Sequence, residues 1–150
     1  MYTFNAPTTG APEDLIQEEG YPAYPGAEIA KFSPTSGQTI AVIDFSGIHL
    51  VDVDSKKERL FIEKKGIISM EWSPLDTFVV TCEKLKQNEK NLQIWNATTG
   101  ECVQDFEYRN APKLGAKSIK FDVDEKFSAR QIGNNMIEIY ESSNFKEPKF

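Results

Sequence analysis

The feature that most constrains this chain is a set of short apolar segments and polar turns that recurs in the same order. From Ile29 onward, apolar segments of strand length alternate with turns rich in Gly, Pro, Ser and Asp, a pattern that is typical of antiparallel strands. The first round predicts four strands, at residues 29–32, 39–44, 48–53 and 59–63. The second round predicts four more, at 67–72, 77–83, 91–96 and 101–108. The third predicts strands at 118–121, 127–132 and 136–141, with residues from Asn144 onward for its last strand.

Two series of anchor residues give this recurrence a period. Aromatic residues end the first strand of each round, 40 and 49 residues apart, at Phe32, Trp72 and Phe121. The third strands end in related pairs, 44 and 45 residues apart, at Val51-Asp52, Trp95-Asn96 and Tyr140-Glu141. Four strands per unit and a period near 40–45 residues are typical of β-propeller blades, whose third strand ends in Trp-Asp. A β-sandwich also has short strands, but it does not explain why both anchors recur in register.

We therefore predict an all-β chain of WD40-like β-propeller blades, about three four-stranded antiparallel blades at roughly 28–65, 66–110 and 115–150. Residues 1–27 contain four prolines and three glycines, which favour an irregular segment with room for one strand around Leu15-Ile16. Three blades do not close a ring. We therefore expect the chain to be part of a larger propeller, whose remaining blades would cover its apolar faces and strand edges.

Composition limits the partners and the location. The formal net charge is -6, so the chain lacks the basic excess of most nucleic-acid-binding domains, and any contact with RNA needs a local basic patch or another region. The chain has neither a cation before Lys31 nor an apolar run approaching the roughly 20 residues of a membrane span. These observations indicate a cytoplasmic protein without membrane contact.

Residues capable of catalysis or metal binding do not form a recognisable motif. His49, the only histidine, has no second acid–base group in a motif, so we expect a polar or hydrogen-bonded histidine on a strand face. The acidic stretch from Asp122 to Glu125 lacks the distal glutamate of a calcium loop and is predicted to be a turn. We therefore predict no catalytic, cofactor or metal residues, and a binding module instead of an enzyme. A hydrolase with a metal in the channel would need ligands from other blades.

The two cysteines are expected to stay reduced. Cys82 and Cys102 fall on the second and fourth strands of one predicted blade. Two strand spacings separate their Cα atoms by about 10 Å at best, which is more than a disulfide allows. We expect thiols in a core or an interface.

Two stretches resemble a known family. Residues 91–106 resemble the second blade of the eukaryotic translation initiation factor 2A family, and the residues Phe127–Arg130, Asn134-Asn135, Tyr140-Glu141 and Asn144-Phe145 look like its next blade. The resemblance covers roughly residues 28–145. It implies a nine-bladed N-terminal propeller followed by a flexible, charged C-terminal region. It also implies association with the small ribosomal subunit and GTP-independent delivery of initiator methionyl-tRNA.

On this resemblance we expect a translation initiation scaffold. Its partners would be the rRNA and proteins of the small ribosomal subunit, other initiation factors, and initiator tRNA through regions outside this chain. The alternative is a generic WD40-like protein-interaction scaffold without a direct tRNA role, such as the propeller of subunit b of translation initiation factor 3.

Two basic stretches are the candidate contact residues. Lys84, Lys86 and Lys90 lie in a loop that is longer than its equivalent of about three residues in the first blade. Propellers tend to bind partners through inserted loops on a rigid scaffold. The second stretch, Arg109, Lys113 and Lys117, lies between two blades. Glutamates alternate with lysines in the first loop, so a solvated loop without a partner is the alternative.

Overall fold

The computed structural model describes residues 3–4, 15–16, 22–109, 112–133 and 135–149. These residues form antiparallel sheets whose strands pair in chain order. The first sheet consists of β3 (Ile29–Phe32), β4 (Thr39–Ile43), β5 (Gly47–Asp52) and β6 (Lys57–Glu63). The second consists of β7 (Ile67–Trp72), β8 (Phe78–Glu83), β9 (Leu92–Asn96) and β10 (Cys102–Phe106). The third consists of β11 (Ile119–Phe121), β12 (Phe127–Ile132) and β13 (Met136–Glu141). The predicted all-β, WD40-like architecture is confirmed.

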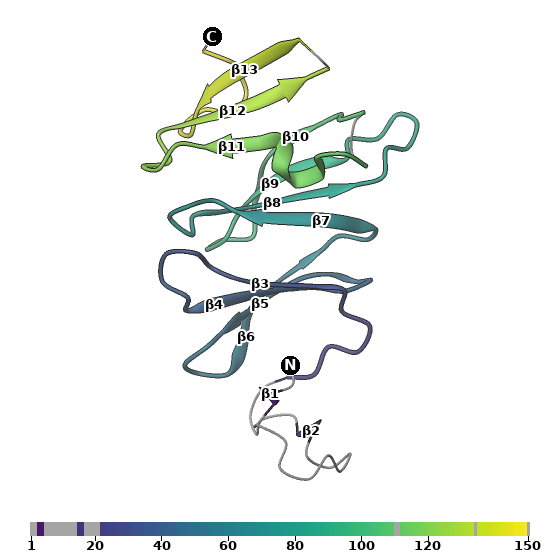
Figure 1. Ribbon diagram of the computed structural model, residues 1–150, viewed down its shortest axis with the longest axis vertical. Helices are drawn as coiled ribbons and strands as arrows, with labels where there is room; N and C mark the ends of the chain where they lie inside the picture. Colours follow the sequence, from purple (N-terminus) through teal and green to yellow (C-terminus); the bar gives the residue numbers. More distant parts are fainter. Residues whose placement is uncertain (1–2, 5–14, 17–21, 110–111, 134, 150) are drawn as a thin grey trace.

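The three sheets are stacked face to face along the long axis of the molecule (Figure 1). Two apolar clusters fill the spaces between them. The cluster between the first and second sheets includes Leu50, Ile62, Met70 and Trp95. The cluster between the second and third sheets includes Phe78, Leu92 and Tyr140 among its buried residues. Each sheet is therefore stabilised mainly by burying apolar side chains against its neighbour.

The second strand of the first two sheets is buried on both faces. Every residue of β4 is buried, and every residue of β8 is buried. A strand that is covered on both sides needs a continuous apolar run instead of an alternating one. This explains the uninterrupted run Ile40–Ile43, which a half-exposed strand would not contain.

The third sheet differs from the prediction of four strands. Among the described residues it has three strands, and Asn144 forms only an isolated bridge with Glu141. A short 3-10 helix, η2 (Gly115–Ser118), precedes β11 and was not anticipated. Gly115 has a φ of 54°, and a Cβ there would lie 2.2 Å from the Ser69 Oγ atom. The η2 turn therefore packs directly on β7, where the backbone N–H of Ala116 donates to the same Ser69 Oγ at 2.8 Å.

The N-terminal prediction falls largely outside the described residues. Within 1–21, the structure describes β1 (Thr3–Phe4) and β2 (Leu15–Ile16), which pair with each other antiparallel. The strand expected around Leu15-Ile16 is therefore present, and its partner β1 was not predicted. Within the described residues there is no helix that is long and apolar enough to cross a membrane.

The cysteines lie where the strand assignment placed them. Cys82 in β8 and Cys102 in β10 are separated by β9, and both thiols are free, as predicted. Burial, helped by the neighbouring Glu83 carboxylate, raises the pKa of Cys82 to about 12. A thiol with such a pKa stays protonated at neutral pH and is a poor nucleophile.

Carboxylates tie the first turn of each sheet to the first turn of the sheet before it. Asp76, in the β7–β8 turn, accepts hydrogen bonds from the backbone N–H groups of Thr35 and Ser36 in the β3–β4 turn, both at 2.9 Å. Glu125, in the β11–β12 turn, accepts one from the backbone N–H of Leu75 at 2.6 Å. Both acidic residues follow the aromatic anchor of their round by four positions, with φ values of 65° and 55°. The sheets are therefore linked in register at one edge.

This link predicts a measurable loss of stability when Asp76 is replaced. Partial burial raises the pKa of Asp76, but the hydrogen bonds from Thr35 and Ser36 outweigh burial and hold it below the usual value. We expect Asp76→Ala to lower the free energy of unfolding by about 1–2 kcal/mol at pH 7, since hydrogen bonds to a charged group are lost at a partly exposed site. Urea unfolding measures this change. Asp124→Ala, an exposed neighbour of Glu125, is the matched control, and an equal effect of both substitutions would contradict the link.

Candidate functional site

The order of the strands separates the connections into two groups at opposite edges of the stack. Consecutive strands are antiparallel, so the β4–β5, β6–β7, β8–β9 and β10–β11 connections all lie at one edge. We call this edge, formed by residues 44–46, 64–66, 84–91, 107–109 and 112–118, the loop rim. The opposite edge, formed by residues 33–38, 53–56, 73–77, 97–101 and 122–126, is the turn rim. In Figure 1 the turn rim faces left and the β8–β9 loop projects to the right.

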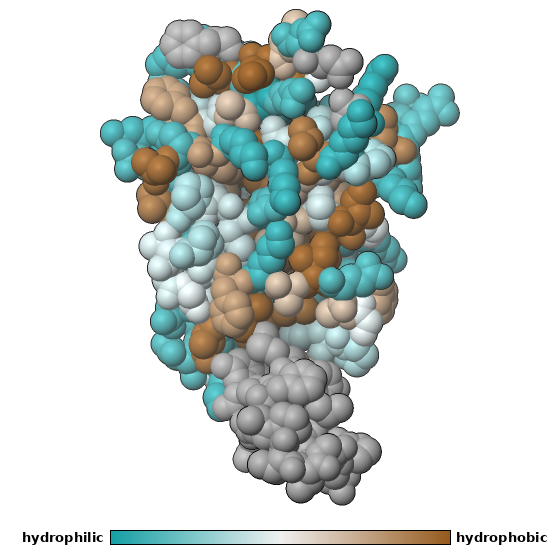
Figure 2. Space-filling model, in the orientation of Figure 1, coloured by the Kyte–Doolittle hydropathy of each residue, from teal (hydrophilic) through white to brown (hydrophobic). Residues whose placement is uncertain are grey.

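The two rims carry opposite charge. The loop rim contains eight Lys or Arg residues and three carboxylates, whereas the turn rim contains two Lys and six carboxylates. In Figure 2, hydrophilic side chains project from both sides of the stack, including the side where Figure 1 draws the β8–β9 loop. The chain is acidic as a whole, with a formal net charge of -6, yet one of its edges is basic. The local basic patch that an RNA contact would need is therefore present.

Both basic stretches predicted from the sequence lie on the loop rim. The cluster of Lys84, Lys86 and Lys90 belongs to the β8–β9 connection, and that of Arg109, Lys113 and Lys117 to the β10–β11 connection. A shallow depression is lined by residues of both loops, including Lys86 and Arg109. The structure therefore brings Lys86 and Arg109 to one depression, whereas Lys113 and Lys117 do not line it.

Sequence reasoning missed two further cations on this edge, Lys64 and Lys65 in the β6–β7 connection. The predicted strand count could have placed these two lysines on this edge. A sheet of four antiparallel strands returns the chain to the edge where the sheet began, so the connection to the next sheet lies there. Lys64 forms an ion pair with Glu83, and Lys90 forms one with Asp105, each at 3.1 Å. In the described part of the chain, Lys65, Lys84 and Lys86 make no ion pair, so their charge is available to a ligand.

Asn91 holds the base of the β8–β9 loop in place. Its amide Nδ2 donates to the backbone carbonyl of Glu83 at 3.0 Å and to that of Tyr108 at 2.8 Å. Its Oδ1 accepts from the backbone N–H of Tyr108 at 2.7 Å. The side chain is buried, so it bridges both ends of the loop and the start of the next connection. The lysines therefore project from a loop whose two ends are fixed.

The loop rim contains a cleft of about 460 Å³ between the β4–β5 turn, the β6–β7 connection and the β8–β9 loop. Ligand-binding pockets typically have a volume of about 300–1,000 Å³. Its walls include Phe45, Lys65, Ile68, Lys84 and Lys86. The cleft therefore combines unpaired cations with exposed apolar side chains.

A buried chain of hydrogen bonds supports the floor of this cleft. The indole Nε1 of Trp95 donates to Thr81 Oγ1 at 2.8 Å, and that hydroxyl donates to Gln93 Oε1 at 3.1 Å. The Gln93 Nε2 group donates in turn to Glu83 Oε1 at 3.0 Å, which also faces Lys64. Burial raises the pKa of Glu83, although Lys64 and Gln93 act in the opposite direction. The floor is therefore fixed by the core between the first two sheets.

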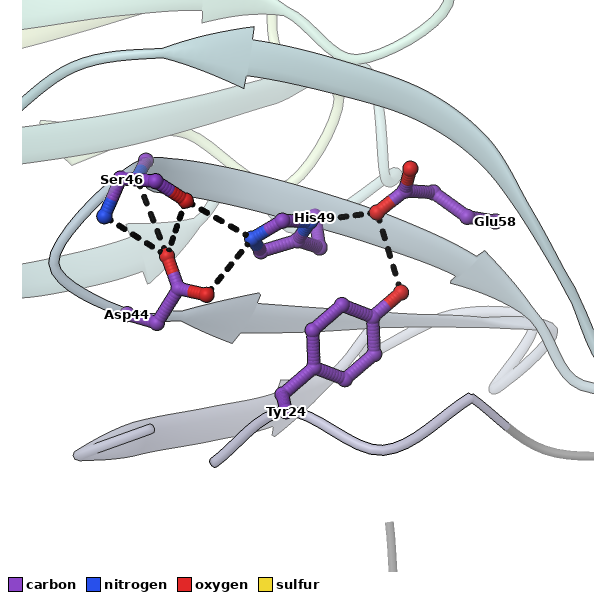
Figure 3. A network of polar contacts seen from close by, with 6 residues as sticks. Tyr24, Asp44, Ser46, His49 and Glu58 are labelled. Atoms are coloured by element: carbon purple, nitrogen blue, oxygen red, sulfur yellow. Dashed lines mark hydrogen bonds and ion pairs between the residues drawn. The ribbon is translucent and has the colours of Figure 1, made fainter. Parts of the chain in front are cut away.

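A second polar network fixes the β4–β5 turn (Figure 3). Asp44 Oδ1 accepts hydrogen bonds from the Ser46 backbone N–H at 2.8 Å, the Ser46 hydroxyl at 2.6 Å and the Gly47 backbone N–H at 3.2 Å. Asp44 Oδ2 lies 2.9 Å from His49 Nε2, and the other ring nitrogen, Nδ1, contacts Glu58 Oε1. Partial burial raises the pKa of Asp44, but the hydrogen bonds from Ser46 and the nearby His49 outweigh it and lower the pKa.

The imidazole of His49 is also enclosed from the sides. Tyr24 lies on one side with its ring centroid 4.4 Å away, and Phe61 stacks on the ring at 4.7 Å. The Tyr24 hydroxyl donates to Glu58 at 3.0 Å. The prediction of a hydrogen-bonded histidine on a strand face is confirmed. The sequence missed its two carboxylate partners, because Glu58 reaches it only through the pairing of β5 with β6.

These contacts serve to position the turn. Ser46, His49 and Glu58 follow the order of a nucleophile, a base and an orienting carboxylate, but the Ser46 hydroxyl lies 2.6 Å from Asp44 and 3.3 Å from His49. A catalytic serine donates to its base, whereas this one donates to a carboxylate. The polar groups of the network are therefore bonded to one another, and these bonds hold the turn that carries Phe45.

The acidic stretch from Asp122 to Glu125 forms the β11–β12 turn, as predicted. Asp122 Oδ1 accepts a hydrogen bond from the Phe127 backbone N–H at 3.0 Å, and Glu125 is engaged by Leu75. Among the residues that the structure describes, no group of three or more His, Cys, Asp or Glu side chains is arranged to hold a metal ion.

Comparison with known proteins finds a relative among curated proteins and many similar solved structures, of which two are described. Eukaryotic translation initiation factor 2A of Caenorhabditis elegans is 28% identical over 111 residues, and the match covers 67% of this chain and 19% of that protein. The crystal structure of a eukaryotic initiation factor superposes with a TM-score of 0.78 at 24% identity, over 92% of this chain and 35% of the other. The C-terminal WD40 domain of Sif2 gives a TM-score of 0.60 at 19% identity, over 82% and 33%. No protein-family model matches.

The two structural matches show the fold, and the sequence match shows distant homology to translation initiation factor 2A. The chain spans about a fifth of the length of that relative.

The Asp44 network makes a pH-dependent prediction. We expect Asp44→Ala to lower the free energy of unfolding by about 2 kcal/mol at pH 7, since several hydrogen bonds to one largely buried carboxylate are lost. The pKa of Asp44 is lowered in the folded state, so its contribution is complete above the unfolded pKa of about 4 and disappears as the pH falls through the folded value. Urea unfolding between pH 7 and pH 3 measures this change. A stability difference that stayed constant down to pH 3 would contradict it, and Asp54→Ala, on an exposed turn, is the control.

Proposed function

We propose that this chain, a distant homologue of eukaryotic translation initiation factor 2A, is part of a larger cytoplasmic propeller that binds the small ribosomal subunit and supports translation initiation without catalysing a reaction. The observation that carries the proposal is the basic loop rim. It presents the unpaired Lys65, Lys84 and Lys86 on a rigid scaffold, where the rRNA backbone would offer phosphates.

Electrostatics supports the loop rim as the contact surface. Neutralising phosphates releases the counterions condensed on RNA, and this release supplies much of the affinity of nucleic-acid-binding proteins. The acidic turn rim would repel the same phosphates, so it would orient the propeller with its loop rim toward the RNA. A chain with a net charge of -6 can bind RNA in this way only because its charges are segregated.

The roles in tRNA delivery and factor assembly rest on the distant homology to translation initiation factor 2A. We propose that initiator methionyl-tRNA is delivered by regions outside this chain, and that the propeller provides the rigid body on which ribosomal proteins and other initiation factors assemble. The candidate residues are those of the loop rim: Lys84, Lys86, Lys90, Arg109, Lys113 and Lys117, together with Lys64 and Lys65.

A second candidate function is a protein-interaction scaffold without a tRNA role, comparable to the propeller of subunit b of translation initiation factor 3. It is favoured by the acidic turn rim, where the exposed Val123 lies between Asp122 and Asp124 in the sequence. An acidic surface with an apolar centre suits a basic peptide segment better than RNA.

The two functions require different surfaces: ribosome binding through RNA requires the loop rim, and binding of a basic peptide requires the turn rim. We expect the chain to co-sediment with small ribosomal subunits at low salt, and the bound fraction to fall as salt is raised. Lys84→Glu combined with Lys86→Glu should reduce the bound fraction at least about tenfold, because two phosphate contacts become repulsive.

The matched control reverses two exposed lysines outside the loop rim, Lys57→Glu and Lys126→Glu. These variants should bind like the unmodified chain. Binding that is lost equally in both pairs, or that does not depend on salt, would count against the loop rim and in favour of the protein scaffold.

A further inference from the structure

Phe45 is an aromatic side chain that is held out in solvent. It lies between Asp44 and Ser46 in the β4–β5 turn and is 78% exposed. The backbone of the turn is held in place both before Phe45, by Asp44, and after it, at Gly47. Asp44 is bonded to Ser46, Gly47 and His49, and the φ of Gly47 is 153°.

Only glycine fits beside Phe45 at position 47. A Cβ on Gly47 would lie 2.1 Å from the backbone carbonyl oxygen of Ile62, so the turn packs against β6 at this point. Exposing a phenyl ring to water is unfavourable, and the ring is presented by a turn that cannot easily fold it back. A ring held out in this way offers a face on which a flat ligand can stack.

The surroundings of Phe45 define the chemistry of that ligand. Phe45 shares the 460 Å³ cleft with Ile68, which is 40% exposed, and with the unpaired Lys65, Lys84 and Lys86. A ligand that fills this cleft needs a flat apolar part to cover the ring and an anionic part to meet the lysines. A nucleotide has both parts, since every base has a face that stacks on aromatic rings and every phosphate is anionic.

The carboxylates of the cleft are compatible with this ligand. Asp44 is engaged by its own turn, and Glu83 by Lys64 and Gln93. The remaining two, Glu28 and Glu89, repel phosphate but can accept hydrogen bonds from the amino groups of a base. An acidic peptide would satisfy the lysines, but it would meet these two carboxylates and leave the ring of Phe45 uncovered.

We propose that the cleft between the β4–β5 turn and the β8–β9 loop binds one nucleotide of a single-stranded RNA segment, with the base stacked on Phe45 and the phosphates bound by Lys65, Lys84 and Lys86. This inference rests on the proposed function, because it specifies how the loop rim would recognise RNA. It predicts that unpaired bases bind, and that duplex RNA, whose bases are stacked inside, binds less tightly.

The test separates stacking from charge with two probes, a fluorescein-labelled twelve-nucleotide adenosine RNA and inorganic polyphosphate of similar length. Fluorescence anisotropy gives the Kd of the RNA, and competition gives that of polyphosphate. We expect Phe45→Ala to raise the Kd for the RNA about tenfold, the effect of losing one base–aromatic stack, and to leave the Kd for polyphosphate unchanged. Phe45→Trp should retain RNA binding. Phe32→Ala, which removes an exposed ring outside the cleft, is the matched control.

The outcomes distinguish this inference from the proposed function. If the chain binds RNA through Lys84 and Lys86 but Phe45→Ala has no effect, the nucleotide site is wrong while the basic rim remains. Equal affinity for RNA and polyphosphate would also overturn the site and would favour an acidic protein partner. If neither probe binds and ribosomal subunits do not bind either, the proposed function itself fails. Circular dichroism of Phe45→Ala checks that the sheets are intact, so that a loss of binding reports on the ring.

Discussion

The even number of antiparallel strands in each complete sheet is the constraint on which the rest of the structure depends. A four-stranded meander returns the chain to the edge where it started, so the next sheet begins there too. Each connection is thereby assigned to one of two rims, and cations from three separate segments gather on one of them. A basic surface can then exist on an acidic chain, because the topology sorts charges that the sequence distributes along its whole length.

Packing between the sheets gives these rims a defined geometry. On the turn rim, Asp76 and Glu125 link successive sheets through backbone hydrogen bonds. On the other side, a chain of buried hydrogen bonds runs from Trp95 to Glu83 and Lys64 at the floor of the cleft. Buried polar groups that are bonded in this way specify one arrangement, because an alternative packing would leave them unsatisfied. The core that stabilises the sheets therefore also positions the site.

The recurring pattern was sufficient to predict most strands of the sheets. It did not predict which side chains meet in the candidate site. Apolar alternation and turn residues located eleven strands nearly to their ends, because the strand period and the turn chemistry are local properties. The η2 turn was missed because Gly115 is required by its contact with Ser69, a residue of a distant strand. Lys86 and Arg109 were recognised as candidates from composition, but not as residues that line the same depression. The roles of Phe45 and His49 depend on cross-strand register and on packing against other segments, which a single sequence does not display.

Lysine footprinting in the complex with small ribosomal subunits tests directly whether the loop rim is the contact surface. An amine-reactive reagent is added to the free and the bound chain, and the extent of modification at each lysine is read by mass spectrometry. We expect Lys65, Lys84 and Lys86 to be protected in the complex, and Lys57 and Lys126 to be modified to the same extent in both states. Protection of Lys57 and Lys126 with continued modification of the loop rim would contradict this expectation.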